Sequence, residues 1–289
     1  NIRSLEDIKM LPIIKKEYLK ENISKFDTLK RMKRIATKIY LTSGTTGKPL
    51  PITKTIASES FQFAVWWRHK SRFGITPLCN RLTFGARTIN DFNNNLKPFR
   101  KPLFTNRSYI NGSEINKQSA KEIINFINIA GFEFFEGYPS AIDLLSKEMI
   151  NQKLTLDNPP KIIFAGSDQL LNQQKSRWEK TFGVPISEQY GMVEFAGNLS
   201  KCEQGNYHED FECGHVELIK KDEQNIKKLI LTGWGNIAMP LIVPAPENRL
   251  PHIKMPPLEP PAQRTRAKRR DEKLESDVFL PSLRVYRYR

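Results

Sequence analysis

From residue 117 to residue 190 the chain alternates amphipathic stretches of helical length with short apolar runs, and this alternation limits the possible folds most strongly. Apolar side chains at helical spacing predict helices over 117–130, 141–150 and 170–182. Apolar runs rich in Phe and Ile predict strands over 132–135, 161–165 and 186–190. Strands and helices in this order are typical of a mostly parallel sheet with helices on its faces. The sequence therefore predicts an α/β fold.

Further elements are predicted on both sides of this region. They are short helical pieces at 4–7 and 15–20, strands at 38–42 and 50–55, a helix at 56–73, a loop at 90–106, and an antiparallel strand pair at 215–220 and 228–232. The first group forms a strand-loop-strand-helix unit. The last pair adds a small β element after the α/β body.

Both ends of the chain lead to expectations about its completeness. Asn1 is not a methionine and no hydrophobic signal core follows it, so we expect residues upstream. Residues 243–261 are rich in proline, and residues 264–270 are rich in arginine and lysine. Because proline fixes φ and removes a backbone donor, we expect 243–289 to stay extended or disordered. Its composition also suggests a change of reading frame.

Composition excludes several classes of protein. Apolar residues make up 39 % of the chain, which argues against general disorder, and no stretch approaches the roughly 18 uncharged apolar residues that cross a bilayer. Three cysteines are too few for a disulfide framework and favour a reducing, cytoplasmic compartment. The net charge of +15 is dispersed. We therefore expect neither a nucleic acid nor a membrane as partner, and the oligomeric state stays open.

A loop rich in glycine and hydroxyl residues joins the strands predicted at 38–42 and 50–55. It contains Thr42, Ser43, Gly44, Thr45, Thr46, Gly47, Lys48 and Pro49. Its backbone N–H and side-chain O–H groups suit a polyphosphate, and a lysine there can neutralise phosphate charge. The spacing of its glycines differs from that of a Walker loop. A plain hairpin loop with a solvated lysine is the alternative.

A second candidate site follows the strand predicted at 186–190. Tyr190 and Gly191 end this strand, and Glu194 comes shortly after it. Open α/β sheets bind ligands at the carboxyl ends of their strands. A single carboxylate there can hold Mg²⁺ together with substrate phosphates. A solvated glutamate after a turn is the alternative.

Together these segments resemble the adenylate-forming superfamily of acyl-CoA synthetases. Within it they are most similar to the branch of phenylacetate-CoA ligase and related capsular polysaccharide biosynthesis proteins. The matching segments are 42–49, 137–140, 165–167, 190–194, 202–208, 231–234 and 238–242. The resemblance implies that 1–242 is a partial ATP-binding adenylation domain, equivalent to the large N-terminal domain of that fold. It also implies that the C-terminal lid domain is missing.

The resemblance implies a reaction in which a small carboxylic acid attacks the α-phosphate of ATP and the acyl group then passes to a thiol such as coenzyme A. By position, Thr42, Ser43, Gly44, Thr45, Thr46, Gly47 and Lys48 would hold the phosphates, with Thr42 also catalytic. Gly166, Ser167, Tyr190 and Gly191 would adjoin the adenine, and Glu194 would hold catalytic magnesium. Phe135, Gly137 and Tyr138 would line the acid pocket.

Three questions stay open at this stage. Cys202 and His208 suggest a zinc site, but the Cys-x-Cys-Gly segment that would complete it in the resembled branch does not occur here, so a buried thiol and a surface histidine are the alternative. The family's ribose-binding aspartate segment and mobile lysine are not recognisable, so we expect poor catalysis of the first step. A basic nucleic-acid-binding module and a non-catalytic scaffold are the alternative functions.

Overall fold

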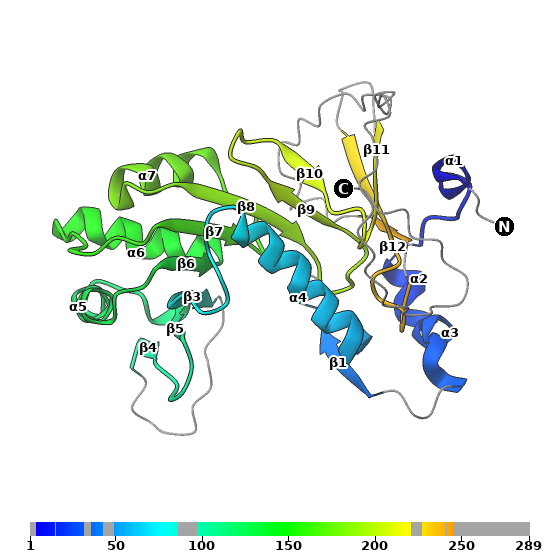
Figure 1. The fold of residues 1–289 in the computed structure, drawn as a ribbon, viewed down its shortest axis with the longest axis horizontal. Helices are drawn as coiled ribbons and strands as arrows, with labels where there is room; N and C mark the ends of the chain where they lie inside the picture. Colours follow the sequence, from blue (N-terminus) through cyan, green and yellow to red (C-terminus); the bar gives the residue numbers. More distant parts are fainter. Residues whose placement is uncertain are drawn as a thin grey trace, which may run out of the picture. The chain divides into compact units, whose positions relative to one another are not determined.

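The computed structural model describes residues 4–14, 16–31, 36–42, 49–85, 97–220, 227–240 and 242–244. An eight-stranded sheet forms its centre (Figure 1). From edge to edge its strands are β10 (Tyr207–Glu209), β9 (Asn198–Lys201), β8 (Ile186–Gly191), β7 (Ile162–Gly166), β6 (Phe134–Gly137), β3 (Arg81–Gly85), β5 (Arg107–Asn111) and β4 (Phe99–Arg100). From β8 to β5 the neighbouring strands are parallel, and β4, β9 and β10 pair antiparallel. The mostly parallel α/β sheet predicted from the sequence is confirmed.

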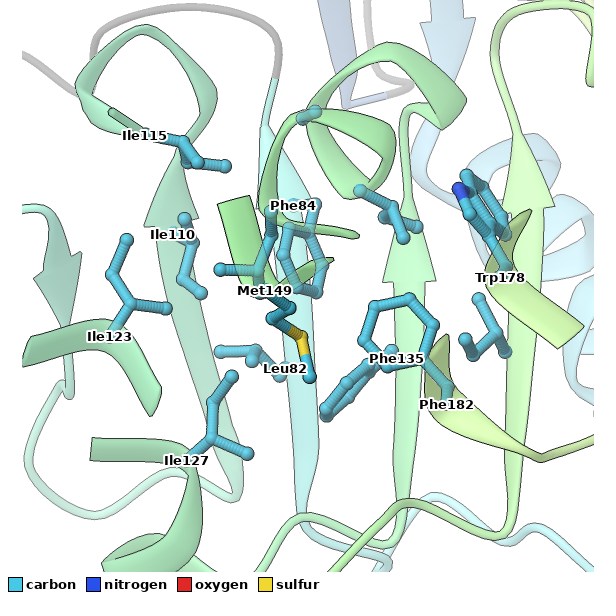
Figure 2. Packing of buried hydrophobic residues seen from close by; sticks show 14 of the residues in the cluster. Leu82, Phe84, Ile110, Ile115, Ile123, Ile127, Phe135, Met149, Trp178 and Phe182 are labelled. Carbon is cyan, nitrogen blue, oxygen red and sulfur yellow. The ribbon is translucent and has the colours of Figure 1, made fainter. Parts of the chain in front are cut away.

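Three helices cover one face of this sheet, and they correspond to the three predicted between 117 and 182. They are α5 (Ala120–Ala130), α6 (Pro139–Gln152) and α7 (Asn172–Phe182). Figure 2 shows their apolar side chains meeting those of the strands; its labelled residues are Leu82, Phe84, Ile110, Ile115, Ile123, Ile127, Phe135, Met149, Trp178 and Phe182. Burying one large apolar side chain contributes about 1.5–3 kcal/mol, so this cluster is the main source of stability.

Helix α4 (Ile56–Ser71) covers the other face. Successive side chains of a strand point to opposite faces, so Phe134 and Phe164 face α4 while Phe135 faces the α5–α7 side. The ring of Trp67 on α4 meets that of Phe134 edge to face, with centroids 6.3 Å apart. The helix begins where strand β2 (Pro51–Thr55) ends, and the hydroxyl of Thr55 caps it by accepting the N–H of Ser58.

Polar contacts fix α4 against the sheet from its middle to its carboxyl end. The pairs are Gln62 with the carbonyl of Met192, Trp66 with Asn198, Arg68 with Asp210, His69 with Ser187, and Lys70 with Glu136. They join one helix to four different strands or their ends. The register of α4 on the sheet is therefore determined by hydrogen bonds and ion pairs as well as by apolar packing.

His69 makes the stability of this packing depend on pH. Burial lowers the pKa of its imidazole from the ordinary value of 6.5 to about 4. The unfolded chain therefore binds a proton at a pH where the folded protein does not, and the stability falls as pH drops from about 6.5 toward 4, by about 3 kcal/mol in total. Between about pH 7 and pH 5 we expect urea unfolding of the unmodified chain to show a loss about 2 kcal/mol larger than that of His69→Gln. Equal losses in both proteins would contradict this role of the histidine.

The remaining elements form smaller layers. They are α1 (Leu5–Ile8), α2 (Lys16–Glu21), α3 (Ile23–Phe26), η1 (Thr28–Arg31), β1 (Thr37–Leu41), η2 (Gly112–Glu114), β11 (Gly214–Lys220), β12 (Lys227–Gly233) and β13 (Ile242–Pro244). β1 pairs antiparallel with β2, and β11, β12 and β13 form an antiparallel sheet. The predicted hairpin at the start and the predicted strand pair near the end are thus confirmed.

Some boundaries differ from those predicted. The strand predicted at 132–135 lies at Phe134–Gly137, and the loop predicted at 90–106 contains the short strand β4. β13 continues to Pro244, two residues past the expected domain boundary at 242, while 245–289 lie outside the described residues. Within the described ranges, every helix is too short or too polar to pass through a lipid bilayer.

Candidate functional site

The neck of the predicted phosphate loop is closed by two hydrogen bonds. The N–H of Thr42 donates to the carbonyl of Leu50 at 3.0 Å, and the N–H of Leu50 donates to the hydroxyl of Thr42 at 3.1 Å. Thr42 is buried, so its hydroxyl serves the hairpin itself. Ser43, Gly44, Thr45, Thr46, Gly47 and Lys48 lie outside the described residues. The structure thus determines where this loop leaves and rejoins the fold.

A pocket lies at the carboxyl ends of β7 and β8, where the sequence places the second site. Its volume is about 370 Å³, including space open to solvent. The lining residues are Ala165, Ser167, Asp168, Gln169, Glu188, Gln189, Tyr190, Gly191 and Tyr207. Ser167, Tyr190 and Gly191 were predicted as site residues, and the structure brings them together. Gly166, the last residue of β7, lies between two lining residues.

Ser167 has a backbone conformation that indicates a specialised turn. Its φ is +71°, in the left-handed region. A residue with a Cβ atom loses about 1–2 kcal/mol there relative to the right-handed region. Strained residues of this kind gather at ligand sites, where the surrounding fold holds them in place. The turn after β7 therefore has the character of a binding loop.

Glu188 is one of two carboxylate residues that line this pocket, with Asp168, and its role was not predicted. Its carboxylate forms an ion pair with Lys201 on β9 and accepts the hydroxyl of Tyr207 on β10 at 3.0 Å. Burial and the neighbouring carboxylate raise the pKa of the Tyr207 hydroxyl, which therefore stays protonated as a donor. Successive side chains of a strand alternate between its two faces, so Glu188 lies on the same face of β8 as Tyr190. This alternation was the signal in the sequence from which its role could have been predicted. Its partners on β9 and β10 could be found only from the fold.

The turn after β8 places Glu194 near the hairpin. Lys54 on β2 is buried beneath this turn and donates to Gln62 at 2.7 Å. Burial lowers the pKa of Lys54 to about 8, and the negative charge of Glu194 opposes this shift. Leu50 at the loop neck and Tyr190 in the pocket belong to one buried apolar cluster. The loop neck and the pocket therefore each contribute a residue to the same buried cluster.

Two metal roles were predicted, and the residues fit one of them. Glu194 is half-buried and follows a strand end, so it can supply the single carboxylate that Mg²⁺ takes beside substrate phosphates. Cys202 lies in the turn between β9 and β10, and His208 is exposed on β10. The part of the chain that the structure describes contains no group of three or more His, Cys, Asp or Glu residues placed to bind a metal. The four ligands of a structural zinc site are therefore not assembled there.

The predicted acid pocket separates into two parts. Tyr138 is half-buried at the start of α6, and its N–H donates to the carbonyl of Phe84 at 3.1 Å. Gly137 precedes it with a φ of +139°, at the carboxyl end of β6. Phe135, in contrast, is fully buried between the rings of Phe84 and Phe182. Its ring points to the core face, which argues against contact with a substrate.

Known proteins resemble this chain in sequence or in fold. No family model matches the sequence. Protein CapK of Staphylococcus aureus is 26 % identical over 242 residues, which are 83 % of this chain and 53 % of that protein. The chain thus spans about half the length of the curated relative that it matches.

Some solved structures have a fold similar to that of this chain. A 2-hydroxyisobutyryl-CoA ligase in its postadenylation state, in complex with R3-HIB-AMP, matches 84 % of this chain and 54 % of its own, with a TM-score of 0.62 and 15 % identity. An open conformation of the same ligase, in complex with 2-HIB-AMP and CoA, matches with a TM-score of 0.59 and 16 % identity, over 84 % of this chain and 60 % of its own. At these identities the likeness shows a shared fold.

Proposed function

This chain is a CapK-like member of the adenylate-forming superfamily, and from that premise we propose that it binds ATP with magnesium and activates a carboxylic acid as an acyl-adenylate. The acyl group would then pass to the thiol of coenzyme A. The observation that carries this proposal is the meeting of the hairpin neck and the pocket in one buried cluster, which contains both Leu50 and Tyr190. The ligase structures that share the fold were solved with an acyl-AMP, and one of them also with CoA.

We assign the adenosine end of ATP to the pocket at β7 and β8. Tyr190 and Gly191 line it from one strand and Ser167 from the next, with Gly166 beside them. The triphosphate would then extend toward the hairpin, where Ser43, Gly44, Thr45, Thr46, Gly47 and Lys48 supply donors and positive charge. Thr42 would act by closing the loop neck, because its hydroxyl is already engaged with Leu50.

In this proposal the residues position the reactants and stabilise the charge on the phosphate oxygens. In the first step a carboxylate oxygen of the acid forms a bond to the α-phosphorus while the bond to the β-phosphate oxygen breaks, and pyrophosphate leaves. In the second step the thiolate of coenzyme A attacks the acyl carbon and AMP leaves. Both steps need aligned reactants and stabilised oxygen charges more than covalent help from the protein.

Glu194 would hold magnesium, which supplies positive charge to the phosphate oxygens when it is bound. Lys54 lies close enough to this carboxylate for the two charges to interact. Tyr138 and Gly137 stay proposed for the acid end of the site, and Phe135 is withdrawn because its ring is enclosed in the core. The acid itself is proposed only as a small carboxylic acid.

Calorimetric titration with ATP in the presence of Mg²⁺ tests this assignment. We expect Glu194→Gln to raise the Kd for Mg·ATP about tenfold or more, because interactions with a charged group contribute about 1.5–3 kcal/mol. A variant that combines Ser43→Ala with Thr46→Ala should show no heat of Mg·ATP binding. Glu179→Gln, which removes an exposed carboxylate on α7, is the matched control and should leave the Kd unchanged. Heats that do not depend on Mg²⁺, or that survive the loop substitutions, would refute the assignment.

A further inference from the structure

The loops that precede β3, β5 and β6 lie at the amino ends of these strands. Together they form one edge of the central sheet, the edge at which these three strands begin. These three strands are parallel, and Arg81 lies opposite Arg107 and Phe134 at their amino ends. The side chain of Asn106 donates to the carbonyl of Cys79 at 3.1 Å, and that of Asn80 donates to the carbonyl of Ala130 at 2.9 Å. The three loops are thus tied together. They lie at the opposite ends of the strands from the proposed nucleotide site.

Large apolar side chains project from this edge into solvent. Their exposed fractions are 88 % for Leu78, 82 % for Leu103, 103 % for Phe104 and 87 % for Ile129. Among the described residues, Met10 is the one other large apolar side chain above 68 %. Four side chains of this kind on one edge exceed the scattered surface apolar residues of an ordinary soluble protein.

Phe104 is also held in a strained backbone conformation. Its φ is +60°, which costs a residue with a Cβ atom about 1–2 kcal/mol. A glycine or an asparagine would relieve this strain at a surface position without loss of packing, because the ring is fully exposed. The loop thus presents an aromatic ring at an energetic cost that the fold itself does not require.

Positive charge lies beside these apolar side chains. Between residues 100 and 107, the segment that carries Leu103 and Phe104, the charged residues are Arg100, Lys101 and Arg107, with no Asp or Glu among them. Lys101 is exposed. Arg107 also belongs to a group in which three cations share the single carboxylate of Glu136. Glu133, in the loop before β6, is paired with Lys161, so positive charge stays in excess at this edge.

We propose that this edge docks on the surface of a membrane that contains anionic lipids. Apolar side chains on a basic surface enter the boundary between headgroups and acyl chains, and lysine and arginine are attracted to anionic headgroups. A nucleic acid would use the basic residues but would leave the apolar tips in water. Leu78 and Ile129 protrude from two separate segments and the neighbours Leu103 and Phe104 from a third, which suits a deformable lipid surface. This proposal departs from the expectation, drawn from the sequence, that no membrane takes part.

Flotation of the full chain with lipid vesicles tests the proposal. We expect binding to vesicles of equal parts phosphatidylcholine and phosphatidylglycerol, at least about tenfold tighter than to phosphatidylcholine alone, since each basic residue near the surface contributes roughly a fivefold increase. Leu103→Gln combined with Phe104→Asn should weaken binding by about tenfold or more. Asparagine tolerates the left-handed conformation at position 104, so this variant keeps the loop geometry. Lys101→Gln, which removes one positive charge beside Leu103, should weaken it by about fivefold.

Matched controls separate this edge from the rest of the molecule. Ile150→Gln removes an exposed apolar side chain from α6, and Lys175→Gln combined with Lys180→Gln removes two positive charges from α7. Both should bind vesicles within about twofold of the unmodified chain. The basic run at 264–270 is present in every variant and cannot explain a difference between them. Glu194→Gln should also bind normally, so failure of the nucleotide assignment would not affect this result.

A fluorescence readout reports insertion directly. The tryptophan of Phe104→Trp should shift to shorter wavelength on mixed vesicles and be quenched by brominated phosphatidylcholine, whereas that of Ile150→Trp should not. The proposal is overturned if the two vesicle types bind equally, or if the loop variants bind like the unmodified chain. It is also overturned if Leu103 and Phe104 are instead required for self-association or RNA retention without vesicle binding.

Discussion

Replacing Glu136 by glutamine is expected to lower the free energy of unfolding by about 3–5 kcal/mol, because it leaves buried cations without their carboxylate. Glu136 on β6 forms ion pairs with Lys70, with Arg107 at 3.7 Å and with Arg81 at 3.9 Å, and it accepts the hydroxyl of Thr83 at 3.0 Å. The side chains of Lys70 and Glu136 are only 11 % and 14 % exposed. Burial by itself would raise the pKa of Glu136, but the neighbouring cations lower it below its ordinary value, so the group is ionised at neutral pH.

A double-mutant cycle in urea measures this effect. Lys70→Met removes the cation that lies closest to the carboxylate, and the two changes together should cost less than their sum by about 1–3 kcal/mol. Glu133→Gln, at the residue just before β6, is the control, since its partner Lys161 is exposed and solvent screens the pair, so the loss should be much smaller. A loss below about 1 kcal/mol for Glu136→Gln would show that solvent already screens this group.

Replacing Gly137 by alanine is expected to destabilise the fold by about 3–5 kcal/mol, since two costs coincide there. A Cβ atom would lie 2.2 Å from the carbonyl oxygen of Phe84 and 2.9 Å from the carbonyl carbon and the nitrogen of the same residue. These are backbone atoms of the neighbouring strand β3, so relief requires the strands to separate, which costs about 1–3 kcal/mol. The φ of +139° adds about 1–3 kcal/mol of strain.

Gly131→Ala separates the two costs. Gly131 ends α5 with a φ of +60°, and no atom lies within 4 Å of an added Cβ. Alanine there should cost only about 1 kcal/mol from its backbone conformation. The two variants are compared by urea unfolding at one pH. Similar losses in both would mean that β3 and β6 adjust freely, and the close approach at Gly137 would then have no structural role.

The parts of the fold that could be predicted from the sequence are those with a strong local pattern. The helices of residues 120–182 have apolar faces at regular spacing, and β7 is a continuous apolar run, so local periodicity was sufficient. β3 and β5 were missed, although β3 lies in the middle of the sheet. Each is five residues long and begins with an arginine, and asparagine and proline precede both, so the local signal indicated loops.

The candidate site was predictable where glycine and tyrosine mark a strand end, as at Tyr190 and Gly191. It was not predictable where a residue acts through distant partners. Glu188 became visible only because β9 and β10 return beside β8 and bring Lys201 and Tyr207 to it. Phe135 was assigned to the acid pocket because it precedes Gly137 and Tyr138 in the chain. Successive side chains of a strand point to opposite faces of the sheet. β6 begins two residues later than predicted, and because two is an even number this shift leaves Phe135 on the same face.

The contacts of α4 have a consequence for any movement of the molecule. The helix follows the hairpin directly and is held to the sheet at Gln62, Trp66, Arg68, His69 and Lys70. Sliding it by one turn, about 5.4 Å, would break all five attachments at the same time. Hairpin, helix and carboxyl-edge pocket therefore form a single stiff frame. A closing motion around a ligand has to be made by other segments swinging against this frame, while the frame itself keeps the spacing between the loop neck and the pocket constant.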